Sequence, residues 1–223
     1  MKKIVLFASL AVFSFNAISQ EISTAEKTRE MYTVSATETI LSWGNVESAG
    51  LETANIARFT PFINFGTQLH MDFSEKSGFY TGLTVRNVGI ITNLNDSVRV
   101  KQRVYTVGIP VAFKVGDMDG NLFAAGFEAE FAINYKQKVF VNEEKSKSNI
   151  WFSDRTNIFL PSVFAEVKSK YGNYIRFKYY LTDFLQEGNQ KVNVSGVDYN
   201  PTRSTMMYVS VGLMMRNLEI VRK

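Results

Sequence analysis

The feature that most constrains this chain is a two-residue alternation of apolar and polar side chains over unusually long stretches. In residues 121–136, one set of alternate positions, from Phe123 to Tyr135, is apolar throughout. The other set includes Glu128, Glu130, Asn134 and Lys136. A helix would mix the two sets around its circumference, whereas a strand places them on opposite faces. The segment is therefore predicted to be a strand with one apolar face and one polar face.

The same alternation predicts seven further strands along the chain. They cover residues 39–46, 59–73, 79–92, 105–115, 159–168, 175–182 and 207–216. The alternation shifts phase after Arg86 and Asn87, which predicts a β-bulge there. Most of these strands exceed the ~5–6 residues usual in soluble sheets and match the ~9–11 that cross a bilayer with tilt. We therefore expect an all-β fold, an eight-stranded antiparallel up-and-down transmembrane β-barrel.

The connections between these strands differ in length in a regular way. Residues 74–77, 116–121 and 169–173 form short links with turn residues such as Asp119-Gly120 and Gly172-Asn173. The links at residues 93–97, 139–155 and 186–203 are longer or more polar. Outer-membrane barrels have short periplasmic turns and longer extracellular loops. This pattern and the even strand number place both ends of the barrel in the periplasm.

The first residues have the organisation of a secretory signal peptide. Lys2 and Lys3 precede an apolar run from Ile4 to Phe15, and Ala17-Ile18-Ser19 has the small-x-small form of a cleavage site. We expect a signal peptide over residues 1–19, a flexible lead-in over 20–38 and the barrel over 39–223. An uncleaved N-terminal anchor is the alternative. The expected location is the cell outer membrane.

Composition excludes several classes of function. The chain has no cysteine, which excludes disulfides, thiolate metal sites and a lipoprotein anchor. The formal charge is +4, and the lysines and arginines are scattered along the sequence, so no nucleic-acid partner is expected. The 18 phenylalanines and 10 tyrosines fit a β-rich membrane protein, because aromatic side chains favour strands and membrane interfaces.

Charged residues occur on the face expected to line the barrel interior. An eight-stranded barrel is just wide enough for its interior to be filled by side chains. Buried charges of opposite sign should pair, because an unpaired buried charge is costly. We therefore expect a polar, side-chain-filled lumen with a structural ion-pair network; a proton or ion path is the alternative. Its predicted members, the outermost of them near the rims, are Arg58, His70, Asp72, Arg86, Lys114, Glu128, Glu130, Glu166, Lys168, Arg176, Lys178 and Arg216.

Few residues suggest any other chemistry, and we expect no enzyme activity, catalytic residue, metal site or cofactor. His70 lies two residues from Asp72, and such a pair could activate a serine, but no serine lies in a nucleophile motif. The segment Asp117–Asn121 lacks the spacing of a calcium loop and is expected to form a tight turn. Trp151 and Phe152 are candidates for an interfacial aromatic belt or for contact with a partner protein.

Several segments resemble the PorT-like outer-membrane β-barrel family. They are YTVGIPVAFK at 105–114, NLFAAGF at 121–127, RFKYYLTD at 176–183 and VSVGL at 209–213. Tyr180 stands where that family often has glycine. The resemblance implies an integral, non-enzymatic barrel, and some members of the family take part in protein secretion to the cell surface.

Three interpretations of the function remain, of which the first is the expected one and the other two are alternatives. The first is a structural or interaction barrel in outer-membrane lipid, an accessory of an envelope or protein-secretion complex that binds partners through loops 139–155 and 186–203. The second is a barrel enzyme acting on lipid or peptide. The third is a soluble periplasmic ligand-binding barrel.

Overall fold

The computed structural model describes residues 30–48, 50–51, 53–142, 144–190, 192–194 and 197–222. The expected signal peptide and residues 20–29 of the expected lead-in lie outside the described residues. The strands in chain order are β1 (Glu30–Ser48), β2 (Ala54–Ile56), β3 (Arg58–Thr60), β4 (Phe65–Ser74), β5 (Ser77–Asn93), β6 (Val98–Gly116), β7 (Leu122–Val141), β8 (Glu144–Trp151), β9 (Phe159–Lys168), β10 (Asn173–Tyr180), β11 (Val192–Val194), β12 (Val197–Tyr199) and β13 (Pro201–Arg222).

The long strands form a closed antiparallel ring. Each pairs with its neighbour in the order β13-β10-β9-β7-β6-β5-β4-β1, with β3 continuing β4 along β1, and β1 also pairs with β13 to close the ring. The closing pair is among the most extended, because β1 follows β13 along its whole length, from Glu30↔Arg222 to Ser48↔Pro201. Counting β3 and β4 as one broken strand gives eight, so the predicted eight-stranded antiparallel barrel is confirmed.

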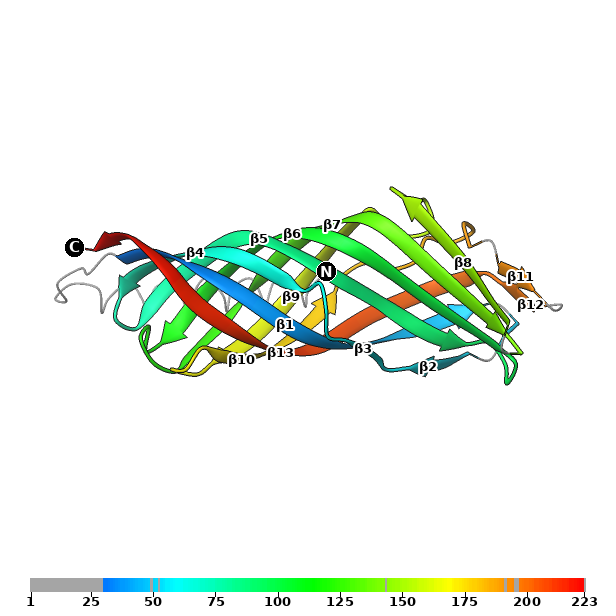
Figure 1. Ribbon diagram of the computed structural model, residues 1–223, viewed down its shortest axis with the longest axis horizontal. Helices are drawn as coiled ribbons and strands as arrows, with labels where there is room; N and C mark the ends of the chain where they lie inside the picture. Colours follow the sequence, from blue (N-terminus) through cyan, green and yellow to red (C-terminus); the bar gives the residue numbers. More distant parts are fainter. Residues whose placement is uncertain are drawn as a thin grey trace, which may run out of the picture.

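The three short predicted links are tight turns at one end of the barrel. The segment Asp117–Asn121 joins β6 to β7, and the amide of Gly120 donates to the carbonyl of Asp117. Gly172 has φ +85°, a left-handed conformation that glycine adopts without steric cost, between β9 and β10. The end of β13 lies at this same end of the molecule, and β8, β11 and β12 lie at the other (Figure 1). We call these the turn end and the head end.

The first strand begins earlier than the sequence suggested. Residues 30–38 belong to β1, so the predicted flexible lead-in to residue 38 is wrong over this part. Tyr32, Val34 and Ala36 point inward and are buried, in the same alternation as Ile40. The outward positions between them are serine and threonine, so the apolar contrast that reveals other strands is weak here.

The second strand is interrupted rather than continuous. Residues 61–64 separate β3 from β4, and Ile63 has φ +64°, which is rare for a β-branched residue. Unbroken alternation with the inward residues Arg58, His70 and Asp72 predicts that Phe62 faces inward, but it is 76% exposed. Pro61 cannot donate to a ladder hydrogen bond, which favours a break at this point.

Two phase predictions also need correction. The expected bulge at Arg86 and Asn87 is absent from β5, whose register with β6 runs without a shift from Ser77↔Val115 to Asn93↔Arg99. Val88 and Ile90 therefore point inward, because the interior becomes apolar at this level. Instead, β7 carries a bulge at Ile133, between the pairs Asn134↔Tyr105 and Ala132↔Thr106. The bulge turns Tyr135 inward, although alternation placed it outside.

The head end is folded, although the sequence suggested loops there. Strands β5, β6 and β7 run past the ends of β9 and β10, and β8 pairs with β7 over residues that β9 does not reach. Inward side chains of β5, β6 and β7, together with Met206 on β13, form an apolar cluster that includes Val88, Val100, Val104 and Val139. Among the described residues, no helix is long and apolar enough to cross a membrane.

Candidate functional site

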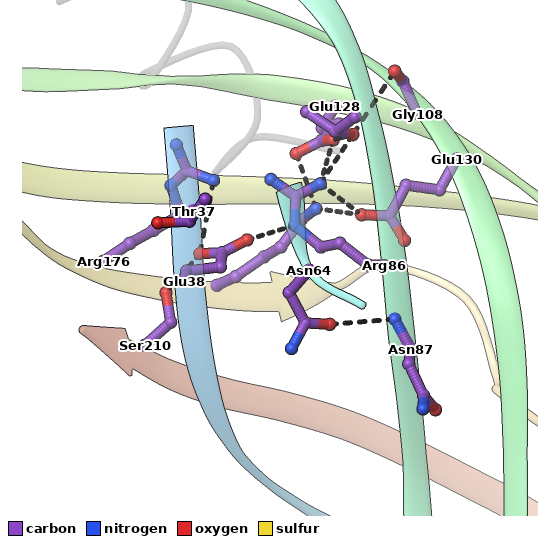
Figure 2. A network of polar contacts seen from close by, with 12 residues as sticks. Thr37, Glu38, Asn64, Arg86, Asn87, Gly108, Glu128, Glu130, Arg176 and Ser210 are labelled. Atoms are coloured by element: carbon purple, nitrogen blue, oxygen red, sulfur yellow. Dashed lines mark hydrogen bonds and ion pairs between the residues drawn. The ribbon is translucent and has the colours of Figure 1, made fainter. Parts of the chain in front are cut away.

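The middle of the lumen holds a cluster of charged side chains around Arg86 on β5. Its guanidinium contacts Glu38 Oε1 at 2.5 Å, Glu130 Oε1 at 3.2 Å and Glu128 Oε1 (Figure 2). Lys178 Nζ lies 2.7 Å from Glu128 Oε2 and also contacts Glu130. Every one of these side chains is almost completely shielded from solvent. Each buried charge therefore has an opposite charge in direct contact, as low-dielectric surroundings require.

Hydroxyl groups complete the hydrogen bonding of these carboxylates. Tyr180 donates to Glu130 Oε2 at 2.8 Å, and Ser210 donates to Glu38 Oε2 at 2.5 Å. Gly108 on β6 leaves room for the cluster, because a Cβ there would lie 2.5 Å from Glu128 Oε1 and 2.7 Å from Thr84 Oγ1. The cluster thus occupies space that a larger residue on β6 would fill.

A second pair extends the network toward the turn end. Arg176 on β10 faces Glu166 on β9 in the strand register, with Nη2 2.7 Å from Oε2. Tyr80 donates to Glu166 Oε1 at 2.8 Å, and Arg176 Nη1 lies 3.7 Å from Glu38 Oε2. Glu38 therefore links the two parts of the network.

A third group surrounds Lys114, nearer the turn end. Lys114 Nζ contacts Asp72, lies 3.1 Å from His70 Nδ1 and donates to the Tyr32 hydroxyl at 3.3 Å. Since an ammonium group only donates, His70 Nδ1 accepts, and Nε2–H donates to Gln68 Oε1 at 2.9 Å. The imidazole is stacked between Tyr32 and Tyr80, with ring centroids 5.1 and 4.9 Å away.

This geometry does not assemble a catalytic triad from His70 and Asp72. Lys114 lies between the two side chains, and both imidazole nitrogens are engaged by groups other than a serine. Within the part of the chain that the structure describes, no group of three or more His, Asp or Glu side chains could hold a metal ion.

The buried charges are balanced in number. Five cations (Arg58, Arg86, Lys114, Arg176, Lys178) and five carboxylates (Glu38, Asp72, Glu128, Glu130, Glu166) are buried in the described residues. Arg58 differs from the other four cations, because it donates to the carbonyl and side-chain oxygens of Asn87. The other four cations and the five carboxylates contact one another directly, and their close packing closes the lumen at mid-height.

Two of the predicted lumen residues lie at the rim. Arg216 has a side chain 37% exposed and pairs with Glu30, and its guanidinium lies 3.9 Å from the Tyr32 ring centroid. Lys168 is half-buried and, with Arg216, lines a cavity of about 220 Å³ that opens at the turn end. The strand ends are wet, so charges there need no buried partner.

Sequence reasoning missed Glu38, which contacts more of the network than most predicted members. It had been assigned to the lead-in, although it continues the inward series Tyr32, Val34, Ala36. This alternation at every second position was the sequence signal that could have placed Glu38 in the lumen.

The outer wall has the opposite polarity. Phe127 is 66% exposed and Leu83 is 60% exposed, at the same levels where charged side chains are buried inside. Similar outward positions are occupied by Ile109, Val111, Phe113, Phe123, Val167, Ile175, Phe177 and Val211. Exposed apolar surface of this extent marks a surface that contacts lipid or protein.

Aromatic residues mark the edge of this apolar wall that is nearer the head end, which we call its upper edge. Phe131 on β7 pairs with Phe159 on β9, with ring centroids 5.3 Å apart. One row higher, Tyr105 and Trp151 both pair with Asn134, from opposite sides of β7. The outward apolar series on β6 from Tyr105 to Val115 spans about 26 Å along the barrel axis, at ~3.4 Å per residue and ~40° tilt. This height matches the ~25 Å apolar band of outer-membrane barrels.

Inside the head, a small polar group is enclosed by the apolar cluster. Gln102 Nε2 donates to Gln190 Oε1 at 2.8 Å and to the Tyr135 hydroxyl at 3.0 Å, and Tyr199 donates to Gln102 Oε1 at 3.1 Å. Burial raises the pKa of Tyr135 and of Tyr199 above the ordinary value for a phenol. Both therefore remain neutral donors at physiological pH.

Comparison with solved structures finds small outer-membrane barrels. Ail, the attachment invasion locus protein of Yersinia pestis, is 10% identical, with 86% of this chain and 100% of that chain covered and a TM-score of 0.33. Neisserial surface protein A is 11% identical over 83% and 97%, with a TM-score of 0.39. OprG of Pseudomonas aeruginosa is 8% identical over 86% and 99%, with a TM-score of 0.41.

The fold assignment rests on the strand pairing of the chain itself, since similarities this distant carry no functional information. No family model matches the chain, and no curated protein sequence matches it. The resemblance to the PorT-like family stays a prediction.

Proposed function

We propose that this protein is an integral barrel of the Gram-negative outer membrane that has a structural or interaction role, as an accessory of an envelope or protein-secretion complex. The observation that carries the membrane location is the reversed polarity of the wall. Arg86, Glu128 and Lys178 are buried in the lumen, whereas Phe127 and Leu83 are on the exposed outer face. In water the outer face would expose an extended apolar surface at a cost, but in lipid that face is favourable.

The proposed orientation places the turn end in the periplasm and the head outside the cell. Short turns on one side and larger segments on the other are typical of outer-membrane barrels. Export through a cleaved signal peptide at residues 1–19 is part of the proposal.

The proposed working surface is the head, because the filled lumen offers no wide passage through the barrel. Residues 139–155 and 186–203 contribute β8, β11 and β12 to it. Trp151 and Phe152 are 64% and 68% exposed at its lower edge. Trp151 lies in the same row as Tyr105, which supports a place for both exposed residues in the interfacial aromatic belt. A partner inside the membrane could also contact them there.

Fractionation with a heat-modifiability gel tests the membrane location. We expect the protein to remain in carbonate-washed outer membranes and to migrate differently with and without boiling. The readout is repeated for a chain in which residues 137–148 are replaced by a two-residue turn that joins the paired residues Lys136 and Asn149. A two-residue insertion at Asp119 is the matched control. Both should remain heat-modifiable. Recovery of the wild type in the soluble periplasm would overturn the proposal.

A second experiment tests the interaction role. Cells carrying Trp151→Ser with Phe152→Ser are cross-linked beside cells carrying Phe73→Ser, a change at the turn end of the wall. We expect the head variant to lose cross-linked complexes that both the wild type and the control retain. If the wild type gives no cross-linked complex in intact cells, the interaction role is wrong.

A further inference from the structure

The outer face of the head carries a patch of seven cations that the sequence does not reveal. Lysines and arginines are scattered along the chain, but outward positions on three neighbouring strands bring them together. They are Arg99, Lys101 and Arg103 on β6, Lys136 and Lys138 on β7, and Lys145 and Lys147 on β8. We call this set the cationic patch.

The register places like charges directly opposite one another. Lys101 pairs with Lys138, which pairs in turn with Lys147, and Arg103 pairs with Lys136. Like charges in directly opposed cross-strand positions destabilise a sheet. None of the ion pairs formed among the described residues involves the patch. An anion bound from outside would therefore stabilise this arrangement of cations.

Two further observations support mutual repulsion within the patch. Glu144, the nearest described carboxylate on β8, occupies an alternate position on the opposite face of that strand from Lys145. The pKa of Lys138 is lowered, first by partial burial and then by neighbouring positive charges, which are Arg103, Lys145, Lys147 and Lys101. An anion bound here would relieve this repulsion.

The height of the patch identifies the kind of anion. Arg103 and Lys136 lie one row above Tyr105, which marks the upper edge of the apolar wall. One row corresponds to about 5 Å along the axis at ~3.4 Å per residue and ~40° tilt, and polar headgroups occupy the ~5–8 Å beyond the hydrocarbon core. Aromatic contacts hold Arg103 and Lys136 near this level, because both lie over the Tyr105 ring at 5.9 and 5.0 Å from its centroid.

We propose that the cationic patch binds the phosphate groups of glycolipid headgroups in the outer leaflet, and so anchors the head to the membrane surface. This inference rests on the proposed membrane location. A membrane-adjacent cation gains roughly fivefold in affinity for an anionic surface, and the gain is lost as salt screens it. The upper row, Lys101, Lys138 and Lys147, reaches phosphates farther from the hydrocarbon core.

The test measures lipid binding by purified protein in neutral detergent micelles. Bisphosphorylated lipid A and dephosphorylated lipid A are titrated separately, and bound molecules are counted by native mass spectrometry. The variant is Lys101→Gln, Arg103→Gln and Lys138→Gln combined. The matched control, Lys76→Gln, Lys170→Gln and Arg203→Gln combined, removes the same charge from exposed positions outside the patch.

We expect the patch variant to bind bisphosphorylated lipid A about 100-fold more weakly, at roughly fivefold per cation. The control should change affinity by less than about threefold, and wild-type binding should weaken in high salt and with the dephosphorylated lipid. The patch variant should resist urea at least as well as the wild type, because removal of opposed like charges relieves strain. With this urea resistance measured, weak lipid binding by the variant reports loss of the patch and not unfolding.

Equal binding of the two lipids, or equal affinity of variant and wild type, would overturn the inference. So would binding of soluble inorganic polyphosphate without binding of lipid A, because the ligand would then not be a membrane component. Fractionation of the same variants separates this inference from the proposed function. An outer-membrane protein that fails the lipid test refutes only the patch, whereas a soluble one refutes the membrane location.

Discussion

Removal of Arg86 should destabilise the barrel more than any substitution of a surface cation. Arg86 contacts three carboxylates, Glu38, Glu128 and Glu130, in surroundings almost free of solvent. Methionine would fill much of the arginine volume but leave those charges with fewer partners. Breaking a buried ion pair by removing one partner costs about 3–5 kcal/mol. We expect Arg86→Met to lower the free energy of unfolding by this amount.

Urea titration in lipid vesicles measures this loss. Tryptophan fluorescence reports unfolding through Trp43 and Trp151. With a slope of ~2 kcal/mol per molar urea, a loss of ~4 kcal/mol lowers the midpoint by about 2 M. The matched control, Arg203→Met, removes an exposed cation and should change stability by less than ~0.5 kcal/mol.

A double variant separates the ion-pair effect from a packing defect. Glu38→Gln in the Arg86→Met background removes a carboxylate that has lost its closest cation, leaving Arg176 Nη1 at 3.7 Å. We expect the double variant to be less destabilised than the sum of the single changes, by ~0.5–3 kcal/mol. A loss below ~1 kcal/mol for Arg86→Met, or additive losses in the double variant, would refute the structural role of the network.

Three further substitutions test the wall and the lumen by the same titration. Phe127→Arg places a charge on the exposed wall and should cost ~2–4 kcal/mol if that wall contacts lipid; a neutral effect would argue for water outside. Gly108→Val directs side-chain atoms at Glu128 and should cost ~1–3 kcal/mol through overpacking, whereas an open lumen would tolerate it. His70→Phe keeps a stacked ring but removes the bond to Lys114, so it should cost ~1–3 kcal/mol and leave membrane location unchanged.

Alternation located most strands, because it reports directly on which face each side chain occupies. It failed where contrast between the faces was weak. On β1 the outward residues Thr33, Ser35 and Thr37 are polar enough to hide the series that includes Glu38. The bulge on β7 was also hidden, because one extra residue at Ile133 changes the phase without a compositional signal.

The contacts within the network were predictable only in part. Arg176 and Glu166 oppose each other across a short turn, so the turn length nearly determines that pair. Arg86 and Glu128 come from strands separated by β6. They meet only because Gly108 has no side chain and because the barrel curves, and neither condition can be derived from alternation in one strand.

The change of phase that suggested a bulge in β5 arises because the apolar face changes sides along a regular strand, and the neighbouring strand β6 shows the same change. On β6, the outward face is apolar from Tyr105 to Val115 but cationic at Arg103 and above. The inward face changes in the opposite sense, from Lys114 near the turn end to Val100 and Val104 in the head. The outward face of this one regular strand is thus apolar below Tyr105 and cationic above it, while its inward face carries Lys114 near the turn end and mainly valine in the head. A barrel in one solvent has no reason to reverse its faces along a strand, because the same face meets the same medium throughout. The reversal at Tyr105 is what a strand requires when it leaves lipid for water, and it sets the cationic patch at the height where phosphates begin.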